Sequence, residues 1–283
     1  MSARRNGPLP SPASRLPATL RLLHPFPSFL VAVLTIALVW VADSDASLEL
    51  YVPLGLGMLL FQFSIGIAND IVDIADDVVA KPWKALPRGI VSRRTAVVAA
   101  AGCAGGGLAV TAGLETRVWL IGLAGWSCGM AYDLHLKRTR LSWLPYSLAF
   151  PLVPVWVYLA ADAWRPLLLW VFPLGAVLGL ALHLANQAPD IDADRRAGVR
   201  GTAQALGNIR SRGIAIGLFG GAGALAVGIL ASESNGRAAL VATDVLFAAL
   251  IAPRATAYVG RDGFFGLLAA ATAVLAVLFL SAV

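Results

Sequence analysis

The chain alternates between long apolar stretches and short polar segments along its whole length. Nine windows are long and apolar enough for helices that cross a bilayer, whose hydrocarbon core of about 30 Å requires about 20 residues. These windows are 27–42, 50–69, 92–113, 117–133, 143–161, 166–186, 211–231, 237–253 and 263–282. They lack the strict alternation of barrel strands, and a backbone in lipid must pair its polar groups internally. We therefore expect an all-α polytopic membrane protein with nine transmembrane helices around a central cavity.

The positions of the basic residues support this count. Of the 22 Lys and Arg, all but Arg117, Arg165 and Arg237 lie before the first window or in the segments after the second, fourth, sixth and eighth windows. Basic residues are enriched in cytoplasmic loops. The pattern predicts a cytoplasmic N-terminus and an outside C-terminus, in an integral protein of a bacterial cytoplasmic membrane.

Composition agrees with a membrane protein, because 58% of the residues are hydrophobic and 13% are charged, against about 25% charged in soluble domains. The net charge of +6 reflects the basic loops. We therefore expect membrane lipid, and no nucleic acid, as a partner. Cys103 and Cys128 lie in apolar windows and indicate no disulfide framework. We expect a cytoplasmic N-terminal segment, 1–26, and a single transmembrane domain, 27–283.

Two acidic stretches share one spacing. ANDIVDIADD (68–77) and ALHLANQAPDIDADRRAGVR (181–200) each contain Asn, Asp and Asp four residues apart. The framed residues are Asn69, Asp73 and Asp77 in the first motif and Asn186, Asp190 and Asp194 in the second. Spacing of i, i+4 and i+8 places three side chains along one face of a helix. Both motifs lie at the predicted cytoplasmic end of an even-numbered window.

The two stretches also contain three aspartates and a proline that are not among the framed residues. Asp70, Asp76 and Asp192 fall outside the frame, and each is interpreted as a solvated neighbour or as a residue behind the metal ligands. Pro189 removes a backbone donor within the second motif, so we expect the helix to kink or break there.

Charge chemistry suggests what two such motifs bind. Two facing helix ends would gather four carboxylates and two amides, which repel one another unless a cation joins them. Mg²⁺ prefers such oxygen ligands and is commonly shared with substrate phosphates. Basic residues follow both motifs, and they are expected where metal and cations together bind a polyanion. The pattern therefore predicts Mg²⁺ and a diphosphate.

These motifs resemble those of the UbiA superfamily of intramembrane prenyltransferases. NDIVDIADD (69–77) is similar to its first Asp-rich motif, and DIDAD (190–194) to its second. KPWKALPRGIVS (81–92) and RAGVRGTAQALG (196–207) are similar to the segments that follow. The resemblance covers nearly the whole chain. It implies transfer of a polyprenyl group from a prenyl diphosphate to an unidentified acceptor, aromatic or otherwise lipophilic.

The resemblance also implies roles for individual residues. The catalytic residues would be Asp73, Asp77, Asp190, Asp194 and Tyr132. The Mg²⁺ ligands would be Asn69, Asp73, Asp77, Asn186, Asp190 and Asp194. The diphosphate would be bound by Lys81, Lys84, Lys137, Arg195, Arg196 and Arg21. In YDLHLKR (132–138), five steps separate Tyr132 from Lys137, one more than in the family's Tyr-x3-Lys element.

Two other functions fit parts of the pattern. A terpene cyclase of the same superfamily would ionise the diphosphate without a separate acceptor. An ion-coupled transporter also uses acids inside the membrane, but near the midplane rather than beside basic loops. Neither the acceptor nor the prenyl length follows from the sequence.

Overall fold

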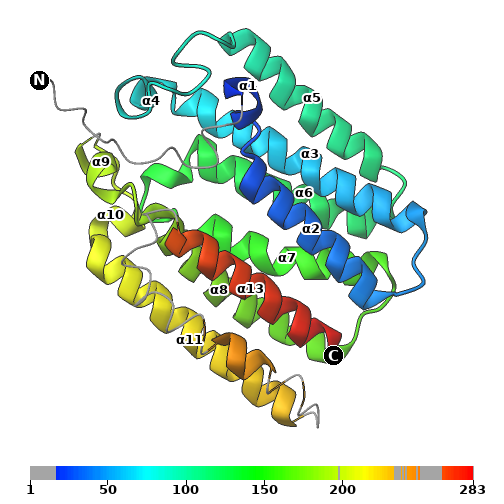
Figure 1. The fold of residues 1–283 in the computed structure, drawn as a ribbon. Coiled ribbons are helices and arrows are strands. Elements are labelled where there is room, and N and C mark those ends of the chain that lie inside the picture. The colour runs from blue at the N-terminus through cyan, green and yellow to red at the C-terminus, as the bar shows by residue number, and fades with distance from the viewer. Residues whose placement is uncertain are drawn as a thin grey trace, which may run out of the picture.

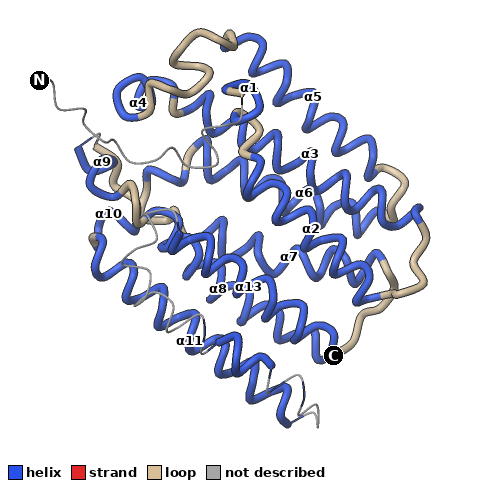
Figure 2. Tube along the Cα trace, in the orientation of Figure 1, coloured by secondary structure: helices blue, strands red, loops and turns tan. Residues whose placement is uncertain are grey.

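The structure is a computed structural model that describes residues 17–196, 198–232 and 263–282, together with parts of 237–248. The described chain is helical, with loops between the helices (Figures 1 and 2). The first half contains α1 (Ala18–Arg21), α2 (Pro25–Ala42), α3 (Leu48–Val72), α4 (Ile74–Ala80), α5 (Arg93–Thr111), α6 (Thr116–Leu134) and η2 (Leu136–Arg138). The second contains α7 (Leu144–Ala160), η3 (Pro166–Trp170), α8 (Val171–Gln187), α9 (Ile191–Arg196), α10 (Thr202–Leu206), α11 (Asn208–Ser232) and α13 (Gly263–Ser281).

Six helices of the described chain are long and apolar enough to cross a membrane: α2, α3, α5, η3 with α8, α11 and α13. The fold class is therefore confirmed as all-α with these candidate spans. The predicted windows 117–133 and 143–161 correspond to α6 and to the shorter apolar helix α7. Window 237–253 lies largely outside the described residues, so the count of nine transmembrane helices stays a prediction.

Close approach between helices depends on glycine at two contacts. A Cβ added to Gly57 of α3 would lie 2.5 Å from Thr111 Cγ2 of α5. A Cβ added to Gly179 of α8 would lie 2.5 Å from the backbone oxygen of Tyr146 in α7. Small residues let membrane helices pack at short distance. The second contact also sets how α7 and α8 present their side chains to the pocket described below.

Short helices gather at one end of the bundle, where α1, α4, α9 and α10 lie near the ends of α3 and α8 (Figure 1). The first motif bends there, because Asp73 lies between α3 and α4 with φ −86° and ψ 3°. The prediction of one continuous helical face is therefore corrected: the motif spans the end of the long helix α3 and the start of the short helix α4. Helical hydrogen bonds still continue across the bend. Asp73 N donates to the backbone oxygen of Asn69, and Asp77 N donates to the backbone oxygen of Asp73.

The second motif is interrupted where proline predicts it. Helix α8 ends at Gln187 and α9 begins at Ile191, with Pro189 between them. Proline lacks the N–H that a continuing helix would use. After the break, α9 lies at the same end of the bundle as α4 (Figure 1).

Candidate active site

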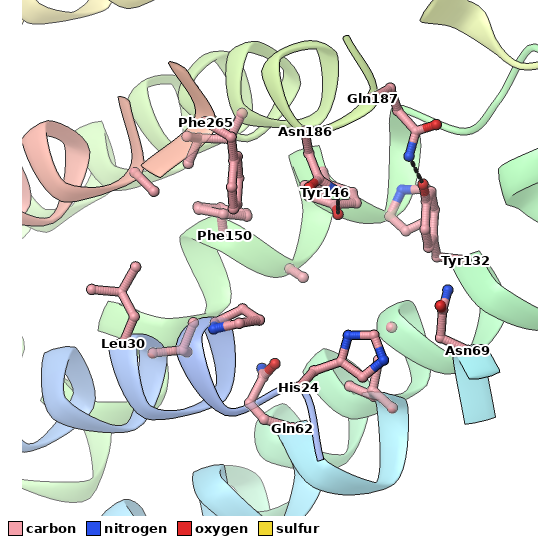
Figure 3. Close-up of a pocket in the computed structure, with 18 of the residues that line it drawn as sticks. His24, Leu30, Gln62, Asn69, Tyr132, Tyr146, Phe150, Asn186, Gln187 and Phe265 are labelled. Atoms are coloured by element: carbon pink, nitrogen blue, oxygen red, sulfur yellow. Dashed lines mark hydrogen bonds between the residues drawn. The ribbon is translucent and has the colours of Figure 1, made fainter. Parts of the chain in front are cut away.

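A pocket of about 1460 Å³ lies among the helices and is lined by residues of α2, α3, α4, α6, α7, α8, α9, α11 and α13. All six framed residues line it: Asn69, Asp73, Asp77, Asn186, Asp190 and Asp194. Figure 3 shows Asn69 of α3 and Asn186 of α8 on opposite walls of the pocket. The two motifs, 117 residues apart in sequence, therefore open into one space.

A direct contact joins the two motifs. Lys81 follows the first motif, and its Nζ lies 3.0 Å from Oδ2 of Asp190 in the second. Carboxylates of both motifs also affect the pKa of Asp194. Burial, then the neighbouring Asp190 carboxylate and more weakly Asp73, raise the pKa of Asp194 above its ordinary value of 3.8. The motifs therefore share one electrostatic environment.

Lys84 neutralises two carboxylates of the first motif. Its Nζ lies 2.8 Å from Asp70 Oδ1 and 2.6 Å from Asp77 Oδ2, and both carboxylates are buried. Burial lowers the pKa of Lys84, but the two carboxylates outweigh this effect and raise it above 10.5. Burial raises the pKa of Asp77 more than Lys84 lowers it. Asp70 is therefore a buried partner of Lys84 and of His24, which lies 3.0 Å away, rather than a solvated neighbour.

The end of α6 and η2 supplies further charged groups. Lys137 Nζ lies 2.6 Å from Asp73 Oδ1, and Arg138 lies 2.5 Å from Asp76 Oδ2. Asp133, which is buried, accepts a hydrogen bond of 2.6 Å from Asn69 Nδ2. Because the amide nitrogen of Asn69 is held by Asp133, its oxygen remains available to a ligand in the pocket.

A hydrogen-bonded chain of amides connects the second motif to Tyr132. Gln204 Nε2 donates to Asp194 Oδ2 at 2.7 Å and to Gln187 Oε1 at 3.2 Å. Gln187 Nε2 donates in turn to Tyr132 Oη at 2.8 Å (Figure 3). The residue before Gln187, Asn186, donates from Nδ2 to Tyr146 Oη at 3.1 Å.

Aromatic rings line the pocket next to the polar end. Tyr132 and Tyr146 meet edge to face with centroids 5.2 Å apart, and Tyr146 stacks on Phe150 at 6.0 Å. His183 packs behind both tyrosines and shares a hydrogen bond with Ser142 Oγ. The pocket therefore changes from charged to aromatic and then to apolar along its length.

The basic residues predicted to bind diphosphate separate into two groups. Lys81, Lys84, Lys137 and Arg196 line the pocket. Arg195 instead donates from Nε to the backbone oxygen of Gln204 at 2.6 Å. Arg21 ends α1, and neither arginine is among the described residues that line the pocket. Their predicted contacts with a ligand stay predictions.

Sequence reasoning missed Asp133, Gln187 and Gln204. Gln187 directly follows Asn186, and Asp133 directly follows Tyr132, so adjacency to a predicted residue was the available signal. Asp192, which falls outside the frame, is exposed on α9, which agrees with the first of its two interpretations, a solvated neighbour, rather than a residue behind the metal ligands.

The carboxylates and amides of the two motifs are oxygen donors of the kind that Mg²⁺ binds. Within the described residues, no three acidic, His or Cys side chains are grouped so as to hold a metal ion by themselves. Instead, lysine ammonium groups lie within 3.0 Å of Asp73, Asp77 and Asp190. Mg²⁺ commonly uses one or two carboxylates together with water and substrate phosphates. The carboxylates and amides here fit Mg²⁺ that is bound jointly with a phosphate-bearing ligand.

Fold and site together define an all-α membrane protein whose apolar pocket has acidic and basic side chains at one end. Residues 29–264 match the UbiA prenyltransferase family, and the chain belongs to this family. The predicted resemblance to the UbiA superfamily is thereby confirmed. No curated protein matches the sequence significantly.

Solved structures share this fold. A UbiA homolog from Archaeoglobus fulgidus bound to GPP and Mg²⁺ superposes with a TM-score of 0.75 at 18% identity, over 93% of this chain and 99% of that chain. The same homolog bound to DMAPP and Mg²⁺ gives 0.74 at 18% identity, with the same coverage. A structure of digeranylgeranylglyceryl phosphate synthase gives 0.63 at 16% identity, over 94% and 97%.

Proposed function

We propose that the protein transfers a prenyl group from a prenyl diphosphate to a lipophilic acceptor in a Mg²⁺-dependent reaction. The observation that carries this proposal is the meeting of both Asp-rich motifs and three lysines at one end of an apolar pocket. This arrangement suits a substrate with a charged head and a long apolar tail. The GPP, DMAPP and Mg²⁺ bound to the archaeal homolog support the proposal.

The lysines are proposed to bind the diphosphate. Lys81, Lys84 and Lys137 each pair with a motif carboxylate. Asp73, Asp77, Asp190 and Asp194 would hold Mg²⁺, which would supply screening of the negative charge on the leaving group. The lysine ammonium groups would then turn to the remaining phosphate oxygens, where charge-assisted hydrogen bonds are strong.

The aromatic rings that line the pocket suggest the course of the proposed reaction. The C1–O bond of the prenyl diphosphate breaks, and its electron pair leaves with the diphosphate. Aromatic faces attract cations through their quadrupole, so Tyr132, Tyr146 and Phe150 would stabilise the allylic cation. The acceptor nucleophile forms a bond to C1 and releases a proton. We propose that Tyr132, held by Gln187, lies next to the acceptor.

The size of the pocket favours transfer over cyclisation. Its volume of about 1460 Å³ exceeds the 300–1,000 Å³ of typical small-ligand sites. A pocket of this size leaves room for an acceptor beside the prenyl chain. A terpene cyclase would need to enclose only one substrate.

A transfer assay tests the function. Purified protein with Mg²⁺ and radiolabelled prenyl diphosphate should release diphosphate and label a lipid when membrane extract supplies the acceptor. Chelation of Mg²⁺ should abolish both products. Asp73→Ala and Asp190→Ala should each reduce turnover on the order of 10²-fold or more, a loss typical of removing preorganised charge stabilisation.

Asp192→Ala is the matched control, because this exposed aspartate lies on the same segment as Asp194. It should keep the turnover of the unsubstituted protein. Near-normal turnover in either motif variant would defeat the metal assignment. Release of diphosphate with formation of a hydrocarbon product, but no acceptor, would instead identify a cyclase.

A further inference from the structure

The apolar part of the pocket is a continuous arm along two helices. On α8, the pocket-lining residues recur every three or four positions along one face: Val171, Leu174, Leu178, Leu182 and Asn186. On α13, the same spacing holds for Phe265, Ala269, Ala273, Ala276 and Leu280. Figure 3 shows Phe265 facing Phe150 on the apolar side of Tyr146. One face of each helix therefore lines the arm from end to end.

Helix geometry gives the length of this arm. At a rise of 1.5 Å per residue, Val171 lies about 22 Å along α8 from Asn186. Leu280 lies about 22 Å along α13 from Phe265 by the same rise. Two helices from different parts of the chain thus give the same length.

Buried side chains close the far end of the arm. We call Leu38, Val171, Phe279 and Leu280 the far-end cluster. These four line the pocket, and each is at most 6% exposed. Tyr158 Oη of α7 donates 2.9 Å to the backbone oxygen of Leu280, which fixes the end of α13. Helix α2 packs on α7 and α13, and α8 packs on α7 and α13, so the four helices surround this end.

We propose that the far-end cluster limits the prenyl diphosphate to about four isoprene units, a geranylgeranyl-sized chain; this inference rests on the proposed function. Three backbone bonds of an extended peptide residue span about 3.5 Å, so the four chain bonds of an isoprene unit span about 4.7 Å. An arm of about 22 Å then holds between four and five units. Shorter chains leave apolar wall uncovered, and longer chains meet the far-end cluster.

Binding across a series of chain lengths tests the proposal. Affinities of the C10, C15, C20 and C30 prenyl diphosphates are measured for the purified protein with Mg²⁺. We expect affinity to rise at least tenfold per added unit up to C20, since one methylene in a fitted apolar pocket is worth about tenfold or more and each unit adds five carbons. Binding should then fall at C30. Equal binding of C20 and C30 would overturn the proposal.

Substitutions within the arm test its geometry. Ala273→Phe fills the arm about 12 Å from the level of Phe265, so the preferred chain should shorten to C10 or C15. Phe279→Ala opens the far end and should raise the affinity for C30 relative to C20. Ala270→Phe is the matched control, because Ala270 is exposed on α13 and does not line the pocket. It should leave the preference for C20 unchanged.

The outcomes separate this proposal from the proposed function. If no prenyl diphosphate binds in the presence of Mg²⁺, the proposed function fails. If all lengths bind alike and Ala273→Phe changes nothing, the function stands and the length limit is wrong. Thermal unfolding of each variant, measured without ligand, confirms that a changed preference comes from the arm and not from loss of the fold.

Discussion

At the scale of single residues, the position of Asp133 has the clearest consequence for the site. This carboxylate is buried, accepts a bond from Asn69 and lies 3.9 Å from Lys137. It does not belong to either motif, yet it holds one predicted metal ligand in a single orientation. Groups behind a metal ligand orient it, and their loss typically weakens metal binding or activity 10- to 100-fold.

We therefore expect Asp133→Ala to raise the Mg²⁺ concentration for half-maximal turnover by about 10- to 100-fold. The reason is that the Asn69 amide then rotates freely and no longer presents its oxygen. The measurement is turnover against Mg²⁺ at saturating prenyl diphosphate.

Asp133→Asn provides a partial rescue, because its amide oxygen still accepts from Asn69. A merely structural role for Asp133 would lower the unfolding temperature and leave the Mg²⁺ requirement unchanged, and that result would contradict the expectation.

The predicted and missed residues differ in how they are recognised. Spacing along one helix identified Asn69, Asp73 and Asp77, and charge beside a motif identified Lys81 and Lys84. Asp133 and Gln204 reach the site from other helices, and the packing between helices decides these contacts. No pattern within one segment records such packing, so adjacency to Tyr132 was the only sequence signal for Asp133.

At the scale of elements, the two motifs are bent for different reasons. Pro189 removes a donor, so the second break could be predicted from one residue. The bend at Asp73 has no proline or glycine at its position. Asp73 instead pairs with Lys137, and Asp77 pairs with Lys84, so contacts with other elements accompany the turn. Such contacts are long-range, which is why local sequence predicted a straight helix.

The α7–α8 contact yields a prediction about stability. Gly179→Ala would place a Cβ 2.5 Å from the backbone oxygen of Tyr146, and a backbone atom cannot move aside as a side chain can. We expect a loss of about 1–3 kcal/mol, the usual cost of overpacking. Displacement of α7 should also move Tyr146 and reduce turnover. Thermal unfolding in detergent and the transfer assay measure the two effects.

Gly217→Ala on α11 is the matched control. A Cβ at Gly217 meets nothing within 4 Å, and alanine favours a helix by up to about 1 kcal/mol over glycine. Equal stability of the two variants would show that the α7–α8 contact can relax.

At the scale of the whole molecule, the charged end of the pocket is proposed to face the cytoplasm. The basic residues Lys81, Lys84, Lys137 and Arg196 all line that end. Cytoplasmic loops are enriched in such residues. A diphosphate made in the cytoplasm would then reach the lysines without crossing the bilayer.

Cysteine labelling tests this orientation. Single cysteines replace Ser44, between α2 and α3, and Arg88, between α4 and α5, in a chain with Cys103 and Cys128 changed to serine. Both positions are exposed. A maleimide that cannot cross membranes should label position 44 in intact cells and position 88 only after lysis. The reverse pattern would contradict the orientation.

Both motifs are proposed to hold one ligand together, and a double-mutant cycle between them tests this. The affinity of geranylgeranyl diphosphate with Mg²⁺ is measured for the unsubstituted protein, Asp73→Asn, Asp190→Asn and the double variant. Residues that act as one unit are non-additive. Each single change should therefore weaken binding about as much as both changes together. Losses that multiply, or normal binding in either single variant, would mean that the two motifs serve separate ligands.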